Sequence, residues 1–413
     1  MLDQKQIVLG VGGSIAAYKS VEILRALCRL GAVVTVVMTK NALEFISPLT
    51  FQTLSGQKTV TTLFDSKEAF RPEHIALSQK ADLVLVAPAT ANLIGKFAGG
   101  IADDSLTSLF LSVRSPILLA PAMNPAMYAN PFVQRNLRLL EEREVGIIEP
   151  AVGEVACGEG GQGRLAPVED IIDRVVLRLG GKSPLRKTKV LISAGPTREY
   201  LDPVRYISNG SSGKMGFALA RAAYLRGAQV TLVSGPNSLP RPCAGIEYIP
   251  VTSTLEMMQA LEQHFPSSSV TIMAAAVSDF RPVRKEHHKI KKSGLSSHSL
   301  ELEKTPDILR HLGRIKTAQQ ILVGFAAETE KLLAHSLGKL EEKNLDLICG
   351  NDITQEGAGF DTDTNILTLI DSRREVVHLP LLSKEKAALR VIEKVESLLL
   401  EKSPSSTLEP VVR

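Results

Sequence analysis

The sequence predicts an α/β protein built from two doubly wound, mostly parallel-sheet domains. Short apolar runs alternate with helical patterns along most of the 413 residues. An apolar strand that runs directly into a glycine-containing turn occurs twice, at Gln6–Val11 and at Lys189–Ser193. Two such starts, in a chain too long for one ordinary core, indicate two domains that each carry a nucleotide-type binding site.

The first half contains four predicted strands joined by helical patterns. The strands are continuous apolar runs, as expected of parallel strands buried on both faces. A helix expected over 14–30 has Ser14 as its N-cap and ends before Gly31. Repeated strand–helix–strand units imply one sheet with right-handed crossovers. The predicted strands are Ile7–Val11, Val33–Thr39, Leu83–Ala87 and Ile117–Ala120.

The pattern breaks after a predicted helix, Ile171–Leu179, and then repeats. Gly, Pro, Ser and basic residues follow this helix, so we interpret 181–188 as a linker between domains of residues 1–180 and 189–400. The polar residues 401–413 are expected to form a disordered tail. The second half contains predicted strands at Val190–Ser193, Val230–Ser234, Val270–Ala275, Ile321–Phe325 and Leu345–Cys349, then a β-hairpin from Asn365–Ile370 and Glu375–Leu379.

Composition and charge exclude several classes of protein. A hydrophobic content of 44% with 22% charged residues is ordinary for a globular protein. No apolar run approaches the roughly 18 residues of a membrane span. The net charge of +4 permits anionic substrates without suggesting nucleic acid. The N-terminus lacks a signal-peptide layout and the four cysteines form no CxxC pair, so we expect a cytoplasmic protein without a disulfide framework or cysteine zinc site.

In the first domain, polar residues follow consecutive predicted strands at the edge where ligands of open α/β sheets bind. The glycines after the first strand would let a phosphate approach the backbone, but they lack the GxGxxG spacing of a dinucleotide site. One such loop could be ordinary turn chemistry, whereas several in succession favour a binding site. The residues are Gly13, Ser14, Thr39, Thr90, Asn92 and Asn124.

Two further side chains in this domain could take part in proton transfer. His74 precedes an amphipathic helix that ends at Lys80, although a lone histidine is more often structural or merely exposed. Cys157 lies among four glycines in 156–164, which we interpret as a mobile loop without helix or strand. A buried structural cysteine is rare in such a loop, whereas a flexible lid could carry a thiol to a substrate.

Together these segments resemble the flavin-dependent cysteine decarboxylases, and in particular the phosphopantothenoylcysteine decarboxylases. The similarity covers 13–19, His74, 87–92, 121–127 and 156–164. It implies a flavodoxin-like domain with FMN held by Gly13, Ser14, Thr39, Thr90 and Asn92. It further implies His74 as the acid–base residue, Asn124 and Met127 as substrate-binding residues, and Cys157 as a proton donor to the reduced intermediate.

The second domain carries a glycine-rich stretch, 209–216, that superficially suggests a P-loop. Its glycines are too close together and no Ser or Thr follows Lys214, so a Walker A motif is excluded. The stretch still opens a helix, expected over Met215–Arg226, whose N–H groups could bind an anion. Further on, a basic segment that includes Lys289 could be a solvated loop, a nucleic-acid patch without aromatics, or a lysine clamp on a triphosphate.

This second half resembles the CTP-dependent phosphopantothenate–cysteine ligases of bacteria. The similarity covers 193–195, 202–209, 211–216, 274–279, 289–292, 324–329 and 343–348. It implies a Rossmann-like domain in which Asn209 binds substrate and handles an acyl-cytidylate intermediate, Asp279 and Lys289 bind the nucleotide, and Mg²⁺ bridges the phosphates. The sequence does not identify the residues that would bind the metal. The rest of the implied CTP pocket is Ala274, Ala275, Pro306, Asp307, Ile308, Leu309, Phe325, Lys339 and Lys343.

The two resemblances imply a bifunctional enzyme of coenzyme A biosynthesis. It would ligate 4′-phosphopantothenate to L-cysteine with CTP and decarboxylate the product to 4′-phosphopantetheine with FMN. A homo-oligomer of trimeric decarboxylase and dimeric ligase units is implied as well. One alternative is an NAD-dependent oxidoreductase, disfavoured because neither turn carries GxGxxG. Another is a non-catalytic flavin-binding regulatory protein, which would have no need of Cys157 or Lys289.

Overall fold

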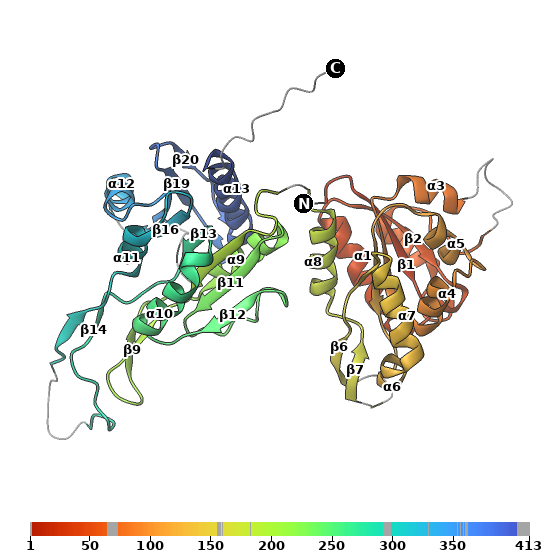
Figure 1. The fold of residues 1–413 in the computed structure, drawn as a ribbon, viewed down its shortest axis with the longest axis horizontal. Coiled ribbons are helices and arrows are strands. Elements are labelled where there is room, and N and C mark those ends of the chain that lie inside the picture. Colours follow the sequence, from red (N-terminus) through yellow and green to blue (C-terminus); the bar gives the residue numbers. More distant parts are fainter. Residues whose placement is uncertain are drawn as a thin grey trace, which may run out of the picture. The chain divides into compact units, whose positions relative to one another are not determined.

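The computed structural model of the chain divides into two compact units, Met1–Gly181 and Lys182–Arg413 (Figure 1). It describes residues 2–63, 73–154, 158, 160–181, 183–291, 299–328, 330–352, 354–355, 357, 359 and 362–402. Each unit has its own sheet. Among the described residues, no helix is both long and apolar enough to cross a membrane.

The first unit contains a parallel five-stranded sheet with the strand order β2-β1-β3-β4-β5. This is the flavodoxin-like order, in which the direction of winding reverses between β1 and β3. The four predicted strands are confirmed, with ends that differ by up to two residues, and the short β5 extends the sheet beyond them. The strands are β1 (Gln6–Val11), β2 (Val33–Met38), β3 (Leu83–Ala89), β4 (Ile117–Pro121) and β5 (Gly146–Ile147).

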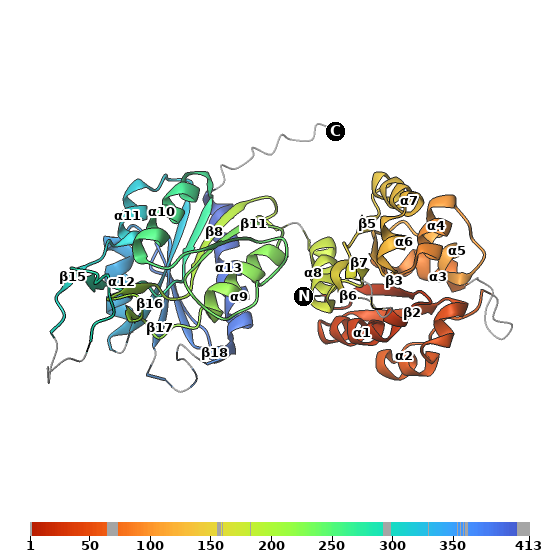
Figure 2. The ribbon, with the colours of Figure 1, turned by 90° about the horizontal axis from the view of Figure 1, so that it is seen from below.

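Helices cover both faces of this sheet (Figure 2). On one face, Val8, Val84 and Val86 of the strands form a core with Leu93 and Leu137 of the helices. The predicted helix over 14–30 is α1 preceded by a 3₁₀ turn, Ile15–Tyr18, and Ser14 caps that turn as expected. The helices are α1 (Lys19–Arg29), α2 (Pro48–Ser55), α3 (Glu73–Lys80), α4 (Ala91–Gly99), α5 (Ser105–Ser112), α6 (Pro125–Ala129), α7 (Pro131–Glu142) and α8 (Val168–Leu179).

The prediction that 156–164 has no strand is wrong for its second half. Strand β6 (Ala151–Glu154) pairs antiparallel with β7 (Gly160–Arg164). The glycines of β7 permit close packing rather than mobility. A Cβ on Gly163 would stand 3.3 Å from the carbonyl carbon of Asn124, and the Gly163 carbonyl accepts the Met123 N–H at 2.9 Å. Cys157 itself lies outside the described residues.

The second unit contains an eight-stranded sheet with the order β12-β11-β8-β13-β16-β17-β19-β20. Its first six strands are parallel and have the Rossmann order 3-2-1-4-5-6, so the predicted fold class is confirmed for both units. The predicted hairpin is also present, as β19 and β20. The strands are β8 (Lys189–Ala194), β11 (Gln229–Ser234), β12 (Glu247–Pro250), β13 (Val270–Met273), β16 (Ile321–Glu328), β17 (Leu347–Asp352), β19 (Leu367–Asp371) and β20 (Val376–His378).

Two cores flank this sheet, one on each face. Helices α9 (Lys214–Leu225) and α13 (Lys384–Lys402) pack on one face, and α10 (Thr254–His264), α11 (Ile308–Ile315) and α12 (Leu332–Glu342) supply buried residues to the other. Among the described residues, three two-stranded antiparallel sheets lie outside the large sheet: β9 (Arg198–Tyr200) with β10 (Tyr206–Ser208), β14 (Phe280–Pro282) with β15 (Leu302–Lys304), and β18 (Thr364–Asn365) with β21 (Leu382–Ser383).

Most of the predicted linker, 181–188, is packed against the second unit. Leu185 is fully buried in that unit's core. The Lys187 N–H donates to the Gly227 carbonyl at 2.9 Å, and the Ser183 hydroxyl donates to the Glu396 carboxylate at 2.5 Å. Gly, Pro and Ser indicate irregular backbone, but irregular backbone can still be part of a domain.

Helix α9 should tolerate no side chain at Gly216. A Cβ there would stand 2.5 Å from the Ala194 Cβ and 3.1 Å from the Ser193 carbonyl oxygen. We expect Gly216→Ala to lower the free energy of unfolding of the second unit by about 1–3 kcal/mol. Urea denaturation followed by far-UV circular dichroism measures this. Gly338→Ala is the matched control: no atom lies within 4 Å of its added Cβ in α12, so this variant should gain up to about 1 kcal/mol. Equal stabilities of the two variants would contradict the close approach of α9 to β8.

Candidate active sites

A pocket of ≈ 570 Å³ lies where the strands of the first sheet end. This volume is within the usual range of small-molecule sites, about 300–1,000 Å³. All five residues expected to bind FMN line it, together with Met127 from the expected substrate set. The predicted residues in the lining are Gly13, Ser14, Thr39, Thr90, Asn92 and Met127.

The ends of β1, β2 and β3 place these residues by backbone contacts. Thr39 is fixed to the first strand because its N–H donates to the Val11 carbonyl at 3.1 Å. Gly13 lies against the neighbouring loop, where a Cβ would stand 2.8 Å from the carbonyl carbon of Asn41. Thr90 caps α4, with its hydroxyl accepting the Leu93 N–H at 3.3 Å. The pocket therefore combines a backbone cradle at Gly13 with hydroxyl groups from three loops.

Charged residues that were not predicted from the sequence also line the pocket. Lys96 pairs with Asp103 at 2.7 Å, and the hydrogen bond from Lys96 lowers the pKa of Asp103. Lys40 follows Thr39 directly, at the end of a predicted strand, so its position was recognisable from the sequence. Asp103 was not, because it comes from a turn with no strand before it. The additional charged and polar residues are Lys40, Asn41, Lys96, Asp103 and Asp104.

Two of the other residues expected to act in this unit, Asn124 and His74, are not in the pocket lining. Asn124 caps α6, and its Oδ1 accepts the Ala126 N–H at 2.8 Å, one helical turn before Met127. His74 lies in α3, and its buried Nδ1 has no hydrogen-bond partner among the described residues. The position of Cys157 is outside the described part of the chain. The geometry thus gathers the FMN set and Met127 but leaves His74 apart from them.

A polar triad ties α6 to the β6–β7 hairpin. The Tyr128 hydroxyl donates to Glu149 at 2.7 Å, and the Gln162 amide donates to the same carboxylate at 3.3 Å. Burial, and then the neighbouring Glu149 charge, raise the pKa of Tyr128. The phenol therefore stays protonated and keeps donating at all ordinary pH values.

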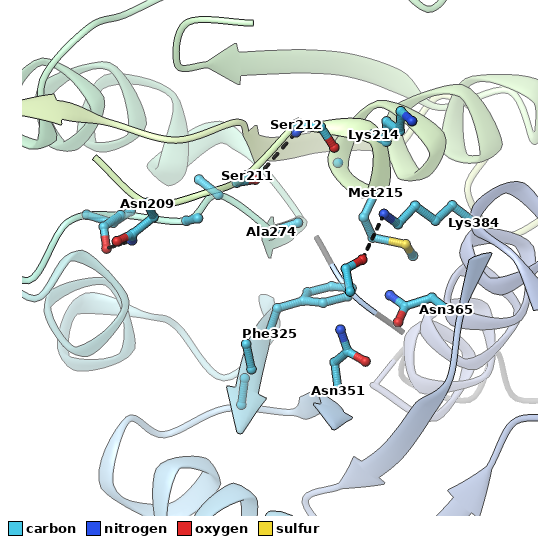
Figure 3. Close-up of a pocket in the computed structure, with 18 of the residues that line it drawn as sticks. Asn209, Ser211, Ser212, Lys214, Met215, Ala274, Phe325, Asn351, Asn365 and Lys384 are labelled. Carbon is cyan, nitrogen blue, oxygen red and sulfur yellow. Dashed lines mark hydrogen bonds between the residues drawn. The ribbon is translucent and has the colours of Figure 1, made fainter. Parts of the chain in front are cut away.

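A second pocket, ≈ 310 Å³ in volume, lies at the corresponding edge of the second sheet (Figure 3). The glycine-rich stretch before α9 forms one wall, and the residues after β13 form another. Several residues expected to bind CTP or substrate line this pocket: Asn209, Ala274, Ala275, Asp279, Phe325 and Lys339.

The remaining predicted CTP residues lie outside the lining. Asp307 caps α11 by accepting the Arg310 N–H at 3.0 Å, and Lys343 pairs with its carboxylate at 2.9 Å. Burial raises the pKa of Asp307, but these donors outweigh it and the pKa is lowered. Ile308 is buried in the core. The other predicted residues outside the lining are Lys289, Pro306 and Leu309.

One buried residue, Thr197, joins the loops that form the walls of this pocket. Its hydroxyl accepts the Ser278 N–H at 2.9 Å and lies 3.1 Å from the hydroxyl of Thr254. Its carbonyl accepts the Ser208 hydroxyl at 2.7 Å. The adjacent Asn209 donates its amide to the Val277 carbonyl at 3.0 Å. Thr197 thus connects the segment that carries Asn209 with the segment that carries Asp279.

The opposite side of the pocket was missed from the sequence. Met215, Asn351, Asn365 and Lys384 gather there around Phe325 (Figure 3). The Lys384 ammonium is almost buried and donates to the Thr362 carbonyl at 2.5 Å. Asn365 ends β18 and Lys384 begins α13. Polar residues at such positions are common in turns and caps, so little in the sequence indicated that these two line a pocket.

Glu328, at the end of β16, holds two side chains of α12. Its carboxylate accepts from the Lys339 ammonium at 2.6 Å and contacts the His335 Nδ1 at 3.1 Å. Burial raises the pKa of Glu328, whereas Lys339 and then His335 lower it, and the net shift is downward. The charge on Glu328 therefore persists at neutral pH and holds Lys339 at the pocket wall.

Family models match nearly all of the chain. The model "Flavoprotein" matches residues 1–180, and the model "DNA/pantothenate metabolism flavoprotein C-terminal domain" matches residues 185–399. The "Coenzyme A biosynthesis bifunctional protein CoaBC" of Bacillus subtilis (strain 168) is 44% identical over 400 residues, which are 96% of this chain and 98% of that protein.

The chain belongs to this family of bifunctional coenzyme A biosynthesis proteins. Proteins of the same name from Vibrio cholerae (46% identical; 94% of this chain, 97% of that protein) and Escherichia coli K12 (42% identical; 97% and 98%) agree. It is thus a bifunctional enzyme of coenzyme A biosynthesis with decarboxylase and ligase halves. The alternatives of an NAD-dependent oxidoreductase and of a non-catalytic flavin protein are excluded.

In the ligase half, the hydroxyl of Thr197 should contribute more to the free energy of unfolding than that of Thr254, although both side chains are buried. Thr197→Val keeps the shape but leaves the Ser278 N–H without its acceptor, so we expect a loss of about 1–3 kcal/mol in the free energy of unfolding. Thr254→Val leaves that acceptor in place and should lose less than about 1 kcal/mol. Differential scanning calorimetry of the full chain gives both values. A larger loss for Thr254→Val would show that the Ser278 contact is unimportant.

Proposed function

We propose that the first unit binds FMN in the pocket at the end of β1–β3 and decarboxylates 4′-phosphopantothenoylcysteine. The second unit uses CTP to join 4′-phosphopantothenate to L-cysteine. The observation that carries this proposal is the gathering of all five expected FMN residues around one pocket of a chain that belongs to the flavoprotein family.

The first pocket fits a phosphorylated flavin by its chemistry. Gly13 has no side chain, so its backbone can lie directly against Asn41 and stay open to a ligand, and Ser14 and Thr39 line the same pocket with their hydroxyls. Lys40 supplies positive charge for a phosphate. When bound, FMN would supply a reversible oxidation that lets the carboxylate of the substrate leave as CO₂.

The protein's own residues would bind the substrate and move protons. The amide of Asn124, with Met127 beside it, would hold the substrate carboxylate. His74 would act as the acid–base residue, and Cys157 would donate the proton that completes the reduced product. His74 has an unpartnered buried Nδ1 among the described residues, a state consistent with a group that meets its partner only in the assembled site.

In the ligase unit, Asn209 would hold the activated acyl group. The bond from its amide to the Val277 carbonyl fixes the direction of the side chain at the pocket wall. The carboxylate of phosphopantothenate would displace pyrophosphate from CTP, and the cysteine amine would then attack the acyl carbon and release CMP. Asp279 and Lys339 at the wall, with Lys289, Asp307 and the other predicted residues beyond it, would bind the nucleotide.

Mg²⁺ would accompany the triphosphate. Proteins usually bind Mg²⁺ through substrate phosphates with only one or two carboxylates. The described residues contain no group of three or more metal-ligating side chains. We propose in the same way a cytoplasmic homo-oligomer with trimeric decarboxylase and dimeric ligase units, as the resemblance of both halves implies.

A coupled assay tests the proposed function. The purified protein should be yellow, and with phosphopantothenate, cysteine, CTP and Mg²⁺ it should release CMP and CO₂ and form phosphopantetheine. Omission of CTP should abolish all three products, because decarboxylation needs the ligated substrate. Phosphopantothenoylcysteine added directly should restore CO₂ release without CTP. Formation of CO₂ from phosphopantothenate in the absence of CTP would contradict the order of the two steps.

Cys157→Ala should separate proton donation from flavin binding. We expect this variant to stay yellow and to release CO₂, but to form phosphopantetheine at least about 100-fold more slowly, the usual contribution of a positioned proton donor. Mass spectrometry of the products measures the ratio. Cys28→Ala, which changes a partly exposed cysteine in α1, is the control and should behave like wild type. Normal phosphopantetheine formation by Cys157→Ala would refute the assigned role.

A further inference from the structure

A buried carboxylate, Asp202, lies in the loop between β9 and β10. Its side chain is 0% exposed. One oxygen, Oδ1, accepts the N–H groups of Val204 at 2.7 Å and Arg205 at 2.8 Å. Those two bonds close the local turn, as an aspartate commonly does. These two hydrogen bonds involve only Oδ1.

The other oxygen, Oδ2, contacts a segment 88 residues away. It accepts the N–H of Ile290 at 3.1 Å and a guanidinium N–H of Arg205 at 3.1 Å. The same guanidinium nitrogen donates to the Ile290 carbonyl at 3.0 Å. Both backbone polar groups of Ile290 are therefore held by the Asp202–Arg205 pair, and we call this arrangement the Ile290 clasp.

The clasp is stronger than a contact between neutral groups. Burial alone would raise the pKa of Asp202. The N–H donors of Val204, Ile290 and Arg205 lower it by more, so the net shift is downward and the carboxylate is ionised at neutral pH. Hydrogen bonds to an ionised acceptor are about twice as strong as neutral ones. A second anchor lies nearby, where the Glu286 N–H donates to the Leu201 carbonyl at 2.8 Å.

The residue next to the clasp is Lys289, which is exposed and does not line the ligase pocket. Among the described residues, its ammonium makes no hydrogen bond or ion pair that would fix its direction. The backbone therefore sets the point from which this flexible side chain extends, and with it the region that the ammonium can reach. The chain that leads from Asp202 through β10 also carries Asn209 at the pocket wall.

We propose that Asp202 is a positioning residue for Lys289: it fixes the Ile290 backbone, and so holds the start of the Lys289 side chain where the ammonium can reach the triphosphate of CTP. This inference rests on the proposed CTP-dependent function. Asp202 itself touches neither substrate nor nucleotide. It acts by bonding the basic segment that contains Lys289 to the loop that carries Asn209. The residues that would bind the nucleotide and the acyl group are thereby attached to one loop.

Asp202→Asn in the full-length protein tests the proposal. The amide removes the charge and, with its oxygen kept by Val204 and Arg205, places an NH2 donor opposite the Ile290 N–H, so KM for CTP should rise roughly tenfold with little change in kcat. Lys289→Ala should raise KM for CTP in the same way. In a protein that already carries Lys289→Ala, Asp202→Asn should cause no further rise in KM for CTP, because the effect of Asp202 is transmitted only through Lys289. A double-mutant cycle measures this coupling.

Asp371→Asn is the matched control. Asp371 also has a 0% exposed side chain and caps a turn, accepting the N–H groups of Arg373 at 3.0 Å and Glu375 at 2.9 Å, but it lies in the β19–β20 hairpin away from the pocket lining. We expect this variant to keep the wild-type KM for CTP. Hydrogen exchange supplies a second measurement: the peptide that contains the Ile290 amide should exchange faster in Asp202→Asn and at the wild-type rate in Asp371→Asn.

Three results would overturn the proposal: a wild-type KM for CTP in Asp202→Asn, an effect of Asp202→Asn that multiplies with that of Lys289→Ala, or an equal rise of KM in Asp371→Asn. Each of these results requires, as its reference, a wild-type protein that turns over CTP. A wild-type protein that forms no CMP contradicts the proposed function instead, and Asp202→Asn then overturns the inference separately if hydrogen exchange at Ile290 is unchanged.

Discussion

The hydrogen bonds of Thr197 hold together the loops from which the ligase pocket is made. The loop after β8 and the loop after β13 come from strands about 80 residues apart, so no local interaction fixes their separation. One buried residue bonds to both, through its hydroxyl to Ser278 and through its carbonyl to Ser208. Because unsatisfied buried polar groups are unfavourable, only one spacing of the two walls satisfies every partner.

The decarboxylase unit solves the same problem with backbone contacts. The Gly12 N–H donates to the Pro88 carbonyl at 3.1 Å, which joins the loop after β1 to the end of β3. The Met123 N–H donates to the carbonyl of Gly163, which joins the loop after β4 to the hairpin. Such contacts need a close approach of the backbones, which Gly12 and Gly163 allow because they have no side chain. The glycines of this unit are thus part of its site even where they do not touch a ligand.

The sequence predicted the central strands of both sheets and the residues at their ends, because strands buried on both faces are continuous apolar runs. It did not predict β12, a short strand whose residues are all partly or fully exposed. The hairpin strand β7 was also missed, because glycines indicate turns unless the partner they pack against is known. Lys384 and Glu328 escaped for a related reason. Their roles depend on contacts with residues from other elements, and a single sequence does not contain those pairings.

The two units place their pockets at the same kind of position. In the first sheet the winding reverses between β1 and β3, and in the second between β8 and β13. At each reversal the adjacent loops turn to opposite faces and leave a crevice at the carboxyl edge. The strand order therefore fixes where a ligand binds, but not which one, since Gly13 and the 209–216 stretch taken alone suggest a dinucleotide and a P-loop. The distinction comes from the polar residues of the other loops: hydroxyls with Lys40 in one unit, Asn209, Asp279 and Lys339 in the other.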